Sequence, residues 1–565
     1  MDYKQLIAKT VRIEGVSEQE IYAAVGVPPR RENGEFCLPC FKFSKALRLS
    51  PAAIADKLKA EIVLPPEIAS AESVAGYLNF KLDRAKLAER TLCEIAAKGE
   101  TFAPHASNGK TVCLDYSSVN IAKPFHIGHL LTTAIGGSLY RIFGYLGYRA
   151  VGINHLGDWG TQFGKLVSAY KRWGNEQDVA ARGVTALNEL YVRFHKEAET
   201  DPALEDEGRH YFKLIEEGDA PTVRLFEWFK QLTLEEVQKV YERLGIVFDS
   251  YAGESFYNDK MQPVIDELAQ KGLLTESEGA RVVDLSDSDM PPCLILKKDG
   301  ATLYATRDLA AAQYRHDTYA FDKNLYVVAY QQNLHFRQVF KVLEKMGRPW
   351  AKDCVHVPFG MVSLEGGAAL STRKGNVVWL KDVLATAVEK AGKIIAEKNP
   401  ALEDKAAVAE TVGVGAIVFS ALSASRIKDM VFSYDKALSF EGETAPYLQY
   451  THARCASILA KGNGAAGNAS GVDFSLLCDD ETVDVIALLG RFESVVAEAA
   501  DKYEPCLISR YLLDLAQSFN RFYIDHRVIA DDAAVTNARL LLTSCVKNTL
   551  KNGLALLLIQ APEKM

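Results

Sequence analysis

The pattern of apolar and polar positions predicts an α/β domain at the start of the chain. Residues 74–83 (VAGYLNFKLD) alternate with a period of two, which predicts a strand. Residues 47–62 (LRLSPAAIADKLKAEI) have helically spaced apolar positions, with Ser50 as the cap and a proline in the first turn. The turn residues of 105–110 (HASNGK) indicate a linker. We therefore expect a separate domain over residues 1–107.

The next part of the chain predicts a parallel sheet. A strand, a loop, a helix and a second strand follow one another, which is one βαβ unit. These segments are TVCLDYSS (111–118), HLLTTAIGGSLYRIFGYLG (129–147) and YRAVGIN (148–154). Further strands are expected at 325–330 and 354–362, alternating with helices. Ligands of such an open sheet bind at the carboxyl ends of its strands. We assign residues 108–380 to this domain.

Helical spacing dominates from about residue 381 onward. We expect a connecting region over 381–435 and a helical bundle over 436–565, interrupted mainly by a glycine-rich loop. The uncharged stretch 411–425 is shorter than the ~20 apolar residues of a membrane span, so it predicts a buried helix. Earlier in the chain, the acidic run 199–210 (ETDPALEDEGRH) predicts a solvated loop.

The composition is that of a soluble globular protein, with 48% hydrophobic and 24% charged residues. The net charge of −8 requires any nucleic-acid contact to be a local basic patch. Of the ten cysteines, only Cys37 and Cys40 form a C-x-x-C, and no second pair completes a zinc site. We expect two buried thiols, no metal site and a reducing, cytoplasmic location.

The strongest chemical signal is His126-Ile127-Gly128-His129, between a predicted strand and a predicted helix. Backbone N–H groups at a helix N-terminus favour phosphate, and the two histidines can donate to phosphate oxygens as charge develops. Gly128 would let a flat base pack against the backbone. The alternative is two ordinary surface histidines near a helix start. These four residues by themselves leave both interpretations open.

Two other glycine-containing segments match nucleotide-binding loops only in part. Residues 160–166 (GTQFGKL) lack the phosphate-loop spacing and the Ser or Thr after Lys165. Residues 413–418 (GVGAIV) lack a third glycine and open no βαβ unit. We expect neither segment to bind nucleotide.

Longer segments around the HIGH sequence carry a resemblance that spans most of the chain. They are LDYSSVNIAKPFHIGHL (114–130), INHLGDWGTQFGKL (153–166), SYAGESFYN (250–258), LYATRDLAAAQYR (303–315), YVVAYQQNLHFRQVF (326–340), LSTRKGN (370–376), TAPYLQYTHAR (444–454) and the terminal GLALLLIQAPEKM. Together they resemble the arginyl-tRNA synthetase family of class I. The early segments LPCFKFSKALR and GYLNFKL resemble its additional N-terminal domain.

This resemblance implies an α/β fold of three parts. They are a class I Rossmann-like catalytic domain with a parallel sheet, an N-terminal α/β additional domain, and a C-terminal α-helical anticodon-binding bundle. The implied activity is that of an arginine–tRNA ligase. ATP converts L-arginine to arginyl-adenylate with release of pyrophosphate, and arginine is then transferred to the 3′ end of tRNA(Arg). The implied partners are ATP as a substrate, Mg²⁺, L-arginine and tRNA(Arg), with no membrane and a monomeric state.

The resemblance also implies which residues recognise arginine. Asp115 and Asp308 would pair with the guanidinium, whose planar fork of donors is matched best by carboxylates. Tyr304 would lie alongside. The alternatives are that Asp115 is a strand-end carboxylate paired with a cation of the chain, and that Asp308 simply decorates a helix.

Other side chains are implied to hold the two ends of the amino acid. Asn120 and Gln332, with Gln331 as a further candidate, would bind the α-amino and carboxylate groups, and His155 is a secondary candidate. A site built to hydrogen-bond its substrate can discriminate by a factor of ~10⁴–10⁵, so no editing domain is expected.

The second class I motif departs from the family pattern. Its form is Lys-Met-Ser-Lys-Ser, and Ala369 stands where the first lysine is expected. In such members a lysine just before HIGH is thought to substitute, and Lys123 has that place. The resemblance implies that Lys123, Arg373 and Lys374 hold the pyrophosphate, that His126 and His129 stabilise the α-phosphate, and that Ser371 contributes to ATP binding.

Basic and aromatic residues alternate in the helical part, as in proteins that stack flipped bases. The resemblance implies tRNA contacts from Tyr447 and Arg454. Further candidates are Lys428, Tyr450, Phe519, Arg521, Phe522, Tyr523 and Arg527. For any single aromatic residue, a place in the core of a helix bundle is the alternative.

Three competing functions are considered. Another class I synthetase such as the cysteine enzyme would need a zinc site, and a small nucleotidylyltransferase would lack the helical carboxy-terminal part. An RNA-binding paralogue without catalytic activity is favoured only by Ala369, whereas the intact His126, Gly128 and His129 favour an enzyme.

Overall fold

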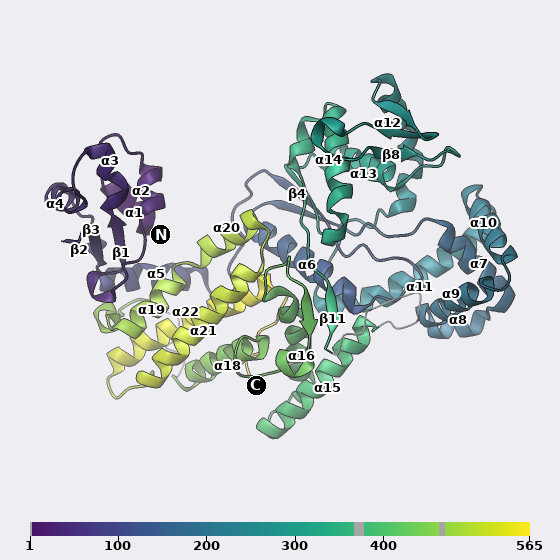
Figure 1. Ribbon diagram of the computed structural model, residues 1–565. Helices are drawn as coiled ribbons and strands as arrows, with labels where there is room; N and C mark the ends of the chain where they lie inside the picture. Colours follow the sequence, from purple (N-terminus) through teal and green to yellow (C-terminus); the bar gives the residue numbers. More distant parts are fainter. Residues whose placement is uncertain (1–2, 366–377, 463–468) are drawn as a thin grey trace. The chain divides into compact units, whose positions relative to one another are not determined.

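The computed structural model describes residues 3–365, 378–462 and 469–565 (Figure 1). The chain divides into two compact units. The first contains residues 1–102, 451–495 and 511–552, and the second contains residues 103–450, 496–510 and 553–565. Each unit is described by itself.

An antiparallel sheet forms the centre of the amino-terminal part of the first unit. Its strand order is β1-β3-β2, with β1 (Phe36–Pro39), β2 (Ile68–Val74) and β3 (Tyr77–Leu82). The single strand predicted over 74–83 is therefore a hairpin turn followed by β3. Ala75 and Gly76 make the turn with φ of 49° and 81°, because a tight two-residue hairpin requires positive φ at both positions.

Helices complete this part of the first unit. They are α1 (Tyr3–Thr10), α2 (Glu18–Ala24), α3 (Ser44–Leu47), α4 (Pro51–Glu61) and α5 (Arg84–Lys98). The predicted helix α4 and its cap are confirmed, because Ser50 Oγ accepts the N–H of Ala53 at 3.2 Å. Cys37 and Cys40 are free, buried thiols, as expected.

The carboxy-terminal region is helical, as predicted. Its helices are α18 (Ala445–Lys461), α19 (Asp480–Leu489), α20 (Phe492–Lys502), α21 (Cys506–Asp525) and α22 (Ala533–Leu556). Within the first unit, α5 packs against α19, and Arg84 forms an ion pair with Asp480 at 2.9 Å.

A parallel sheet organises the second unit. Its strand order is β10-β9-β4-β5, with β4 (Thr111–Asp115), β5 (Arg149–Ile153), β9 (Lys323–Tyr326) and β10 (Cys354–His356). Every residue of β4 is buried, as expected for a central strand covered on both faces. Residues 354–362, predicted as one strand, contain β10 and the first residue of β11 (Val362–Leu364). Strand β11 pairs instead with β12 (Met430–Phe432).

Many helices surround the sheet and its insertions (Figure 1). They are α6 (Leu130–Tyr145), α7 (Thr161–Trp173), α8 (Glu176–Arg182), α9 (Val184–Ala198), α10 (Ala203–Glu216), α11 (Ala220–Leu244), α12 (Met261–Gln270), α13 (Tyr304–Tyr319), α14 (Asn333–Lys345), α15 (Leu380–Lys398), α16 (Lys405–Leu422) and α17 (Tyr434–Ala437). An antiparallel sheet of β6 (Leu274–Ser277), β7 (Ala280–Val283) and β8 (Cys293–Leu296) lies beside α13 and α14. Helices α7 to α11, which follow β5 and precede β9 in the sequence, pack against one another as a separate helical cluster.

Helix α6 follows the HIGH sequence and is almost entirely buried. Gly136 allows it to approach the end of β4 closely, because a Cβ at this position would lie 2.2 Å from Cγ of Tyr116. Helix α16 contains most of the uncharged stretch 411–425 and packs against α15 and α6, so the predicted buried helix is confirmed. By length and composition α16 could cross a membrane, but 61% of this segment is buried within the protein.

The prediction of a solvated loop over residues 199–210 is wrong from Ala203 onward, where α10 begins. Leu204 is buried, and Glu205 pairs with Lys165 of α7 at 2.8 Å. Gly208 also packs against Lys165, and a Cβ there would lie 2.8 Å from its Cγ. The acidic residues thus have basic partners on a neighbouring helix, which the local sequence does not reveal.

Candidate active site at the carboxyl edge of the sheet

The loop that leaves β4 follows a strained path toward the HIGH sequence. Ser117, Ser118 and Ala122 have φ of 67°, 44° and 57°, a left-handed conformation that costs about 1–2 kcal/mol per non-glycine residue. Hydrogen bonds hold the loop in place. The hydroxyls of Ser117 and Tyr241 lie 2.7 Å apart, and the N–H of Ala122 donates to Thr233 Oγ1 at 2.9 Å. Such strain is typical of functional sites whose surroundings over-determine the backbone.

The two histidines of the HIGH sequence form a reciprocal cap at the start of α6. His126 Nδ1 accepts the N–H of Gly128 at 3.0 Å, and His129 Nδ1 accepts the N–H of His126 at 3.2 Å. This network assigns the ring proton of each neutral histidine to Nε2. Gly128 permits the cap, because a Cβ there would lie 2.7 Å from Cε1 of His126.

Both histidine rings are neutral near pH 7. Burial lowers the pKa of His126. Burial also lowers the pKa of His129 to about 3, and the charges of His126 and Lys123 act in the same direction. Lys123 is therefore within electrostatic range of His129, and its ammonium lies 5.9 Å from the ring centre of Tyr191. The site can offer two neutral N–H donors to an anion at the N-terminus of α6.

The chain that follows the second class I motif lies directly beside the HIGH loop. The N–H of Ile127 donates to the carbonyl of Val378 at 3.0 Å, and the N–H of Leu380 donates to the carbonyl of Phe125 at 2.9 Å. The backbones of Trp379 and His126 form an isolated antiparallel β-bridge. Ser371, Arg373 and Lys374, predicted in this motif, lie outside the described residues, as does Ala369.

One face of α13 carries Tyr304, Asp308 and Arg315. Tyr304 is 67% exposed, Asp308 is half-buried and Arg315 is 1% exposed. At 1.5 Å per residue, this face extends about 16 Å from solvent to the protein interior. Asp308 Oδ2 lies 2.6 Å from His335 Nε2. Burial raises the pKa of Asp308, but the hydrogen bond and charge of His335 outweigh it, and the net pKa is lowered. Asp308 is thus a carboxylate near pH 7.

The carboxylate of Asp115 is occupied by other groups of the chain. Arg315 Nη2 donates to its Oδ2 at 2.7 Å, and Ser118 Oγ donates to its Oδ1 at 2.8 Å. This is the pairing with a cation that we considered as the alternative for Asp115. His155 Nδ1 lies 3.5 Å from the same nitrogen of Arg315. Burial lowers the pKa of His155, an effect that Asp115 opposes.

Two carboxyl groups of the site were not predicted. Glu254 begins a 3₁₀ segment (Glu254–Lys260). Burial raises its pKa to about 7; Asp308 and Asp158 act in the same direction, and Arg307 opposes them. Asp158 is fully buried and accepts a hydrogen bond from Lys230 Nζ at 2.6 Å. Both residues occur in segments that carry the family resemblance, but only their burial marks them out. His335, the partner of Asp308, was missed for the same reason.

The amino-acid candidates Asn120 and Gln332 are exposed, and Gln332 ends a 3₁₀ turn (Tyr330–Gln332) just before α14. The backbones of Asn120 and Gly157 form an isolated parallel β-bridge. A Cβ at Gly157 would lie 2.3 Å from Asn120 Oδ1, so the amide packs on the bare glycine backbone.

Gly157→Ala is expected to displace the side chain of Asn120 without unfolding the protein, because φ of Gly157 is not in the left-handed region. If Asn120 binds the amino acid, loss of one such hydrogen bond, about 1.4 kcal/mol, raises KM for arginine about tenfold. Gly144→Ala is the control, since a Cβ there has open space. An unchanged KM in a folded Gly157→Ala variant would contradict a role for Asn120.

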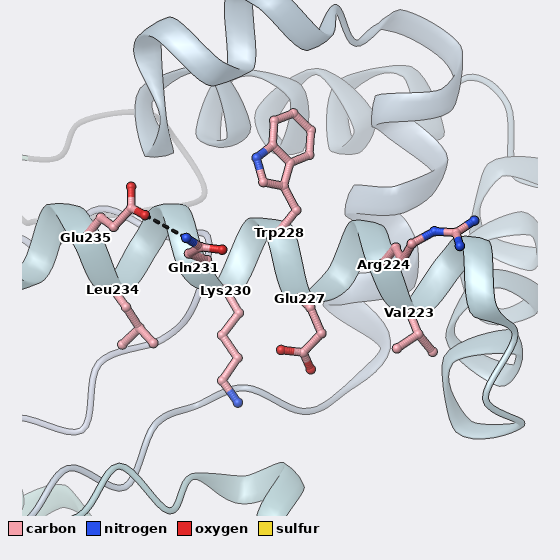
Figure 2. A pocket seen from close by; sticks show the side chains of 8 residues that line it. All are labelled: Val223, Arg224, Glu227, Trp228, Lys230, Gln231, Leu234 and Glu235. Carbon is pink, nitrogen blue, oxygen red and sulfur yellow. Dashed lines mark hydrogen bonds between the residues drawn. The ribbon is translucent and has the colours of Figure 1, made fainter.

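A hollow of about 670 Å³ runs along α11, and Lys230, the partner of Asp158, lines it. Figure 2 shows Lys230 and Glu227 on one side of this helix and Trp228 on the other, with Gln231 hydrogen-bonded to Glu235. None of the predicted site residues lines it. We assign the chemistry to the edge of the sheet, because the histidine pair and the carboxylates lie there.

Asp479, Glu481 and His526 of the first unit have spacings that would suit a metal ion. Nε2 of His526 lies 3.2 Å from Asp479 and 3.7 Å from Glu481, while Arg539 Nη2 lies 3.3 Å from its Nδ1. Arginine can only donate, so Nδ1 of His526 is the acceptor of this contact. Among the described residues, Nε2 approaches the two carboxylates but makes no hydrogen bond to them.

Comparisons with known proteins decide among the competing functions. The family described as "tRNA synthetases class I (R), catalytic domain" matches residues 91–434. The arginyl tRNA synthetase N-terminal domain matches residues 1–82, and the DALR anticodon binding domain matches residues 448–565. The arginine–tRNA ligases of Alkaliphilus metalliredigens and Clostridium botulinum are 49% and 50% identical over 100% of both chains.

The chain belongs to the class I arginyl-tRNA synthetase family.

The fold agrees with this assignment. The arginyl-tRNA synthetase of Thermus thermophilus superimposes with a TM-score of 0.82 over 96% of each chain at 29% identity. The cysteine enzyme and the small nucleotidylyltransferase are thereby excluded as families for this chain, and the three-part α/β architecture implied by the resemblance is confirmed.

The helical region, whose residues 448–565 match the DALR anticodon binding domain, contains the residues predicted to contact tRNA. Phe519 and Phe522 are fully buried and belong to the core. Tyr450 and Tyr523 are partly exposed, at 42% and 39%. The remaining candidates differ in exposure: Tyr447 and Arg454 are half-buried, and Lys428, Arg521 and Arg527 are exposed. In the first unit, Arg454 donates to Asn520 Oδ1 at 2.5 Å and lies 5.5 Å from the ring centre of Tyr523.

Proposed function

We propose that this arginyl-tRNA synthetase family member activates L-arginine with ATP and transfers it to tRNA(Arg) at the carboxyl edge of the parallel sheet. One observation carries the proposal. The ion pair between Arg315 and Asp115 joins the α13 face that bears Asp308 to the strand that leads into the HIGH loop. A site for a guanidinium and a site for phosphate are thus built from one connected set of elements.

The first step is attack of the arginine carboxylate on the α-phosphorus of ATP, with pyrophosphate as the leaving group. His126 and His129 donate from Nε2 to oxygens of the α-phosphate, where negative charge increases in the transition state. Lys123, Arg373 and Lys374 neutralise the departing pyrophosphate, and Ser371 contacts ATP. Mg²⁺ bound with ATP would supply further neutralisation of the phosphate charge.

Arginine is recognised through its guanidinium. Asp308 receives the fork of donors with Tyr304 alongside, and Glu254 is the second carboxyl group within range. Asn120 and Gln332 hold the α-amino and carboxylate ends, and His155, which lies 3.5 Å from Arg315, is a secondary candidate. Asp115 contributes its negative charge to the arginine site, and its carboxylate is at the same time paired with Arg315. Lysine is rejected, because a compact ammonium would leave these acceptors without partners.

The second step attaches arginine to the 3′ end of the tRNA. Tyr447 and Arg454 are the proposed anticodon contacts, by stacking and by hydrogen bonding to bases. We further propose that the enzyme acts as a cytoplasmic monomer without membrane attachment.

The pKa of Glu254 gives the proposal a pH dependence. A bound guanidinium favours the ionised carboxylate, so below pH 7 binding must release a proton from Glu254. KM for arginine is expected to fall as pH rises from 6 to 8, by up to about tenfold per pH unit below the pKa. Glu254→Gln should flatten this profile. Glu276→Gln, at an exposed carboxyl of β6, is the control. A profile that keeps its slope in Glu254→Gln would remove Glu254 from the pocket.

The activity itself is tested by exchange of pyrophosphate into ATP with each of the twenty amino acids, with and without total tRNA. Exchange with arginine alone supports the proposal, and a dependence on tRNA would show that activation waits for it. Exchange with another amino acid would overturn it. Silence from folded protein that still binds tRNA would favour an inactive paralogue.

A further inference from the structure

Arg315 is a charged side chain in the interior of the second unit. It is 1% exposed, and its guanidinium lies 5.3 Å from the ring centre of Tyr326 at the end of β9. A buried cation is tolerated only with a close counter-ion, and Asp115 provides it at 2.7 Å. The pair joins residues 200 positions apart in the sequence. None of the substrate contacts proposed above involves Arg315. Its burial in the protein interior therefore needs another explanation.

The ion pair continues into the strained loop. Asp115 uses its other oxygen, Oδ1, to accept the hydroxyl of Ser118 at 2.8 Å. Ser118 has φ of 44°, and it lies two positions before Asn120 and eight before His126. Hydrogen bonds therefore run without interruption from α13 through Arg315 and Asp115 to the loop that presents the HIGH histidines.

We propose that Arg315 is a positioning residue that holds the HIGH loop in its reactive path by acting through Asp115 and Ser118. The inference rests on the proposed function and deepens it. Helix α13 bears both Arg315 and the guanidinium-binding Asp308, seven residues apart on one face. The arginine pocket and the ATP-binding loop are thus connected through the interior by one helix and two hydrogen bonds.

The geometry at Arg315 suits a guanidinium and not an ammonium. Its Nη2 donates to Asp115 and lies 3.5 Å from His155, while its plane has an aromatic ring beside it. A lysine has a point charge on a flexible stem and cannot keep these relations together. Arg315→Lys therefore retains the buried charge but loosens the connection to the loop.

Ser118→Ala tests the last link without disturbing the buried ion pair. It removes one hydrogen bond to a carboxylate, so we expect kcat for arginine-dependent pyrophosphate exchange to fall about tenfold. KM for arginine should change by less than the fall in kcat, because the guanidinium-binding face of α13 is intact, and the unfolding temperature should stay at the wild-type value. Ser286→Ala is the matched control, because Ser286 Oγ donates to Asp284 Oδ2 at 2.9 Å on the exposed surface.

The double variant Arg315→Lys/Ser118→Ala decides whether the two residues act as one path. We expect Ser118→Ala to lower kcat much less in the Arg315→Lys background than in the wild type. Independent effects that multiply, a wild-type kcat in Ser118→Ala, or a loss of kcat matched by a lower unfolding temperature would each overturn the inference. An inactive wild-type enzyme in the same assay would instead contradict the proposed function.

Discussion

Replacement of His126 or His129 by alanine is expected to lower kcat for adenylate formation by about 10²–10³, as for removal of a single donor to a developing oxyanion. Each ring offers one N–H from Nε2, and the Nδ1 atoms are already occupied by backbone N–H groups. Because burial lowers the pKa of His129 to about 3, this ring gains no proton between pH 6 and 8. The pH–rate profile over this range should therefore contain no step from His129.

Single-turnover formation of arginyl-adenylate, measured with tRNA present, checks this expectation. Binding of tRNA should be retained in both variants, since the lost donors act in the transition state. His210→Ala provides the control, because His210 is an exposed histidine of α10. Wild-type kcat in the His126→Ala/His129→Ala double variant would mean that the pair is only a helix cap.

Asp308→Asn is expected to raise KM for arginine about 30- to 5,000-fold, the range of about 2–5 kcal/mol found when one partner of a buried charge pair is removed. The amide keeps the shape of the side chain and an acceptor for His335. It loses the negative charge that a guanidinium requires. The lowered pKa of Asp308 shows that the pocket stabilises the ionised form, so the wild-type carboxylate is ready for a cation throughout the neutral pH range.

Titration of arginine by calorimetry or by steady-state charging of tRNA measures this effect. The control is Asp317→Asn, which changes an exposed carboxylate of the same helix. A KM for arginine in Asp308→Asn within twofold of wild type would assign the guanidinium to another residue, with Glu254 as the first candidate.

Local sequence was sufficient to predict secondary structure wherever neighbouring residues in the chain determine the backbone conformation. The cap at Ser50, the helix after the HIGH sequence and the buried strands follow from patterns within about 20 residues. The hairpin between β2 and β3 was missed, because positive φ at Ala75 is not visible in its side chain. The helix α10 was missed because its acidic residues are neutralised by α7, a separate element.

The candidate site shows the same division. Tyr304 and Asp308 were found because they lie in one short motif, and HIGH was found because four adjacent residues make it. Arg315 lies in the same motif, yet its ion pair with Asp115 is apparent only in the folded structure, where α13 meets the end of β4. Glu254 was overlooked, because a glutamate has an ordinary pKa until burial raises it.

The sequence by itself thus determined the α/β class, the parallel sheet, the helical carboxy-terminal region and the family to which the chain belongs. These properties depend on periodicity and on motifs of adjacent residues. Tertiary structure alone decided that Asp115 pairs with Arg315, that His335 pairs with Asp308 and that burial raises the pKa of Glu254 to about 7. The physical reason is that electrostatic and hydrogen-bond energies depend on distance and burial in space, and residues 200 positions apart become neighbours only in the folded chain.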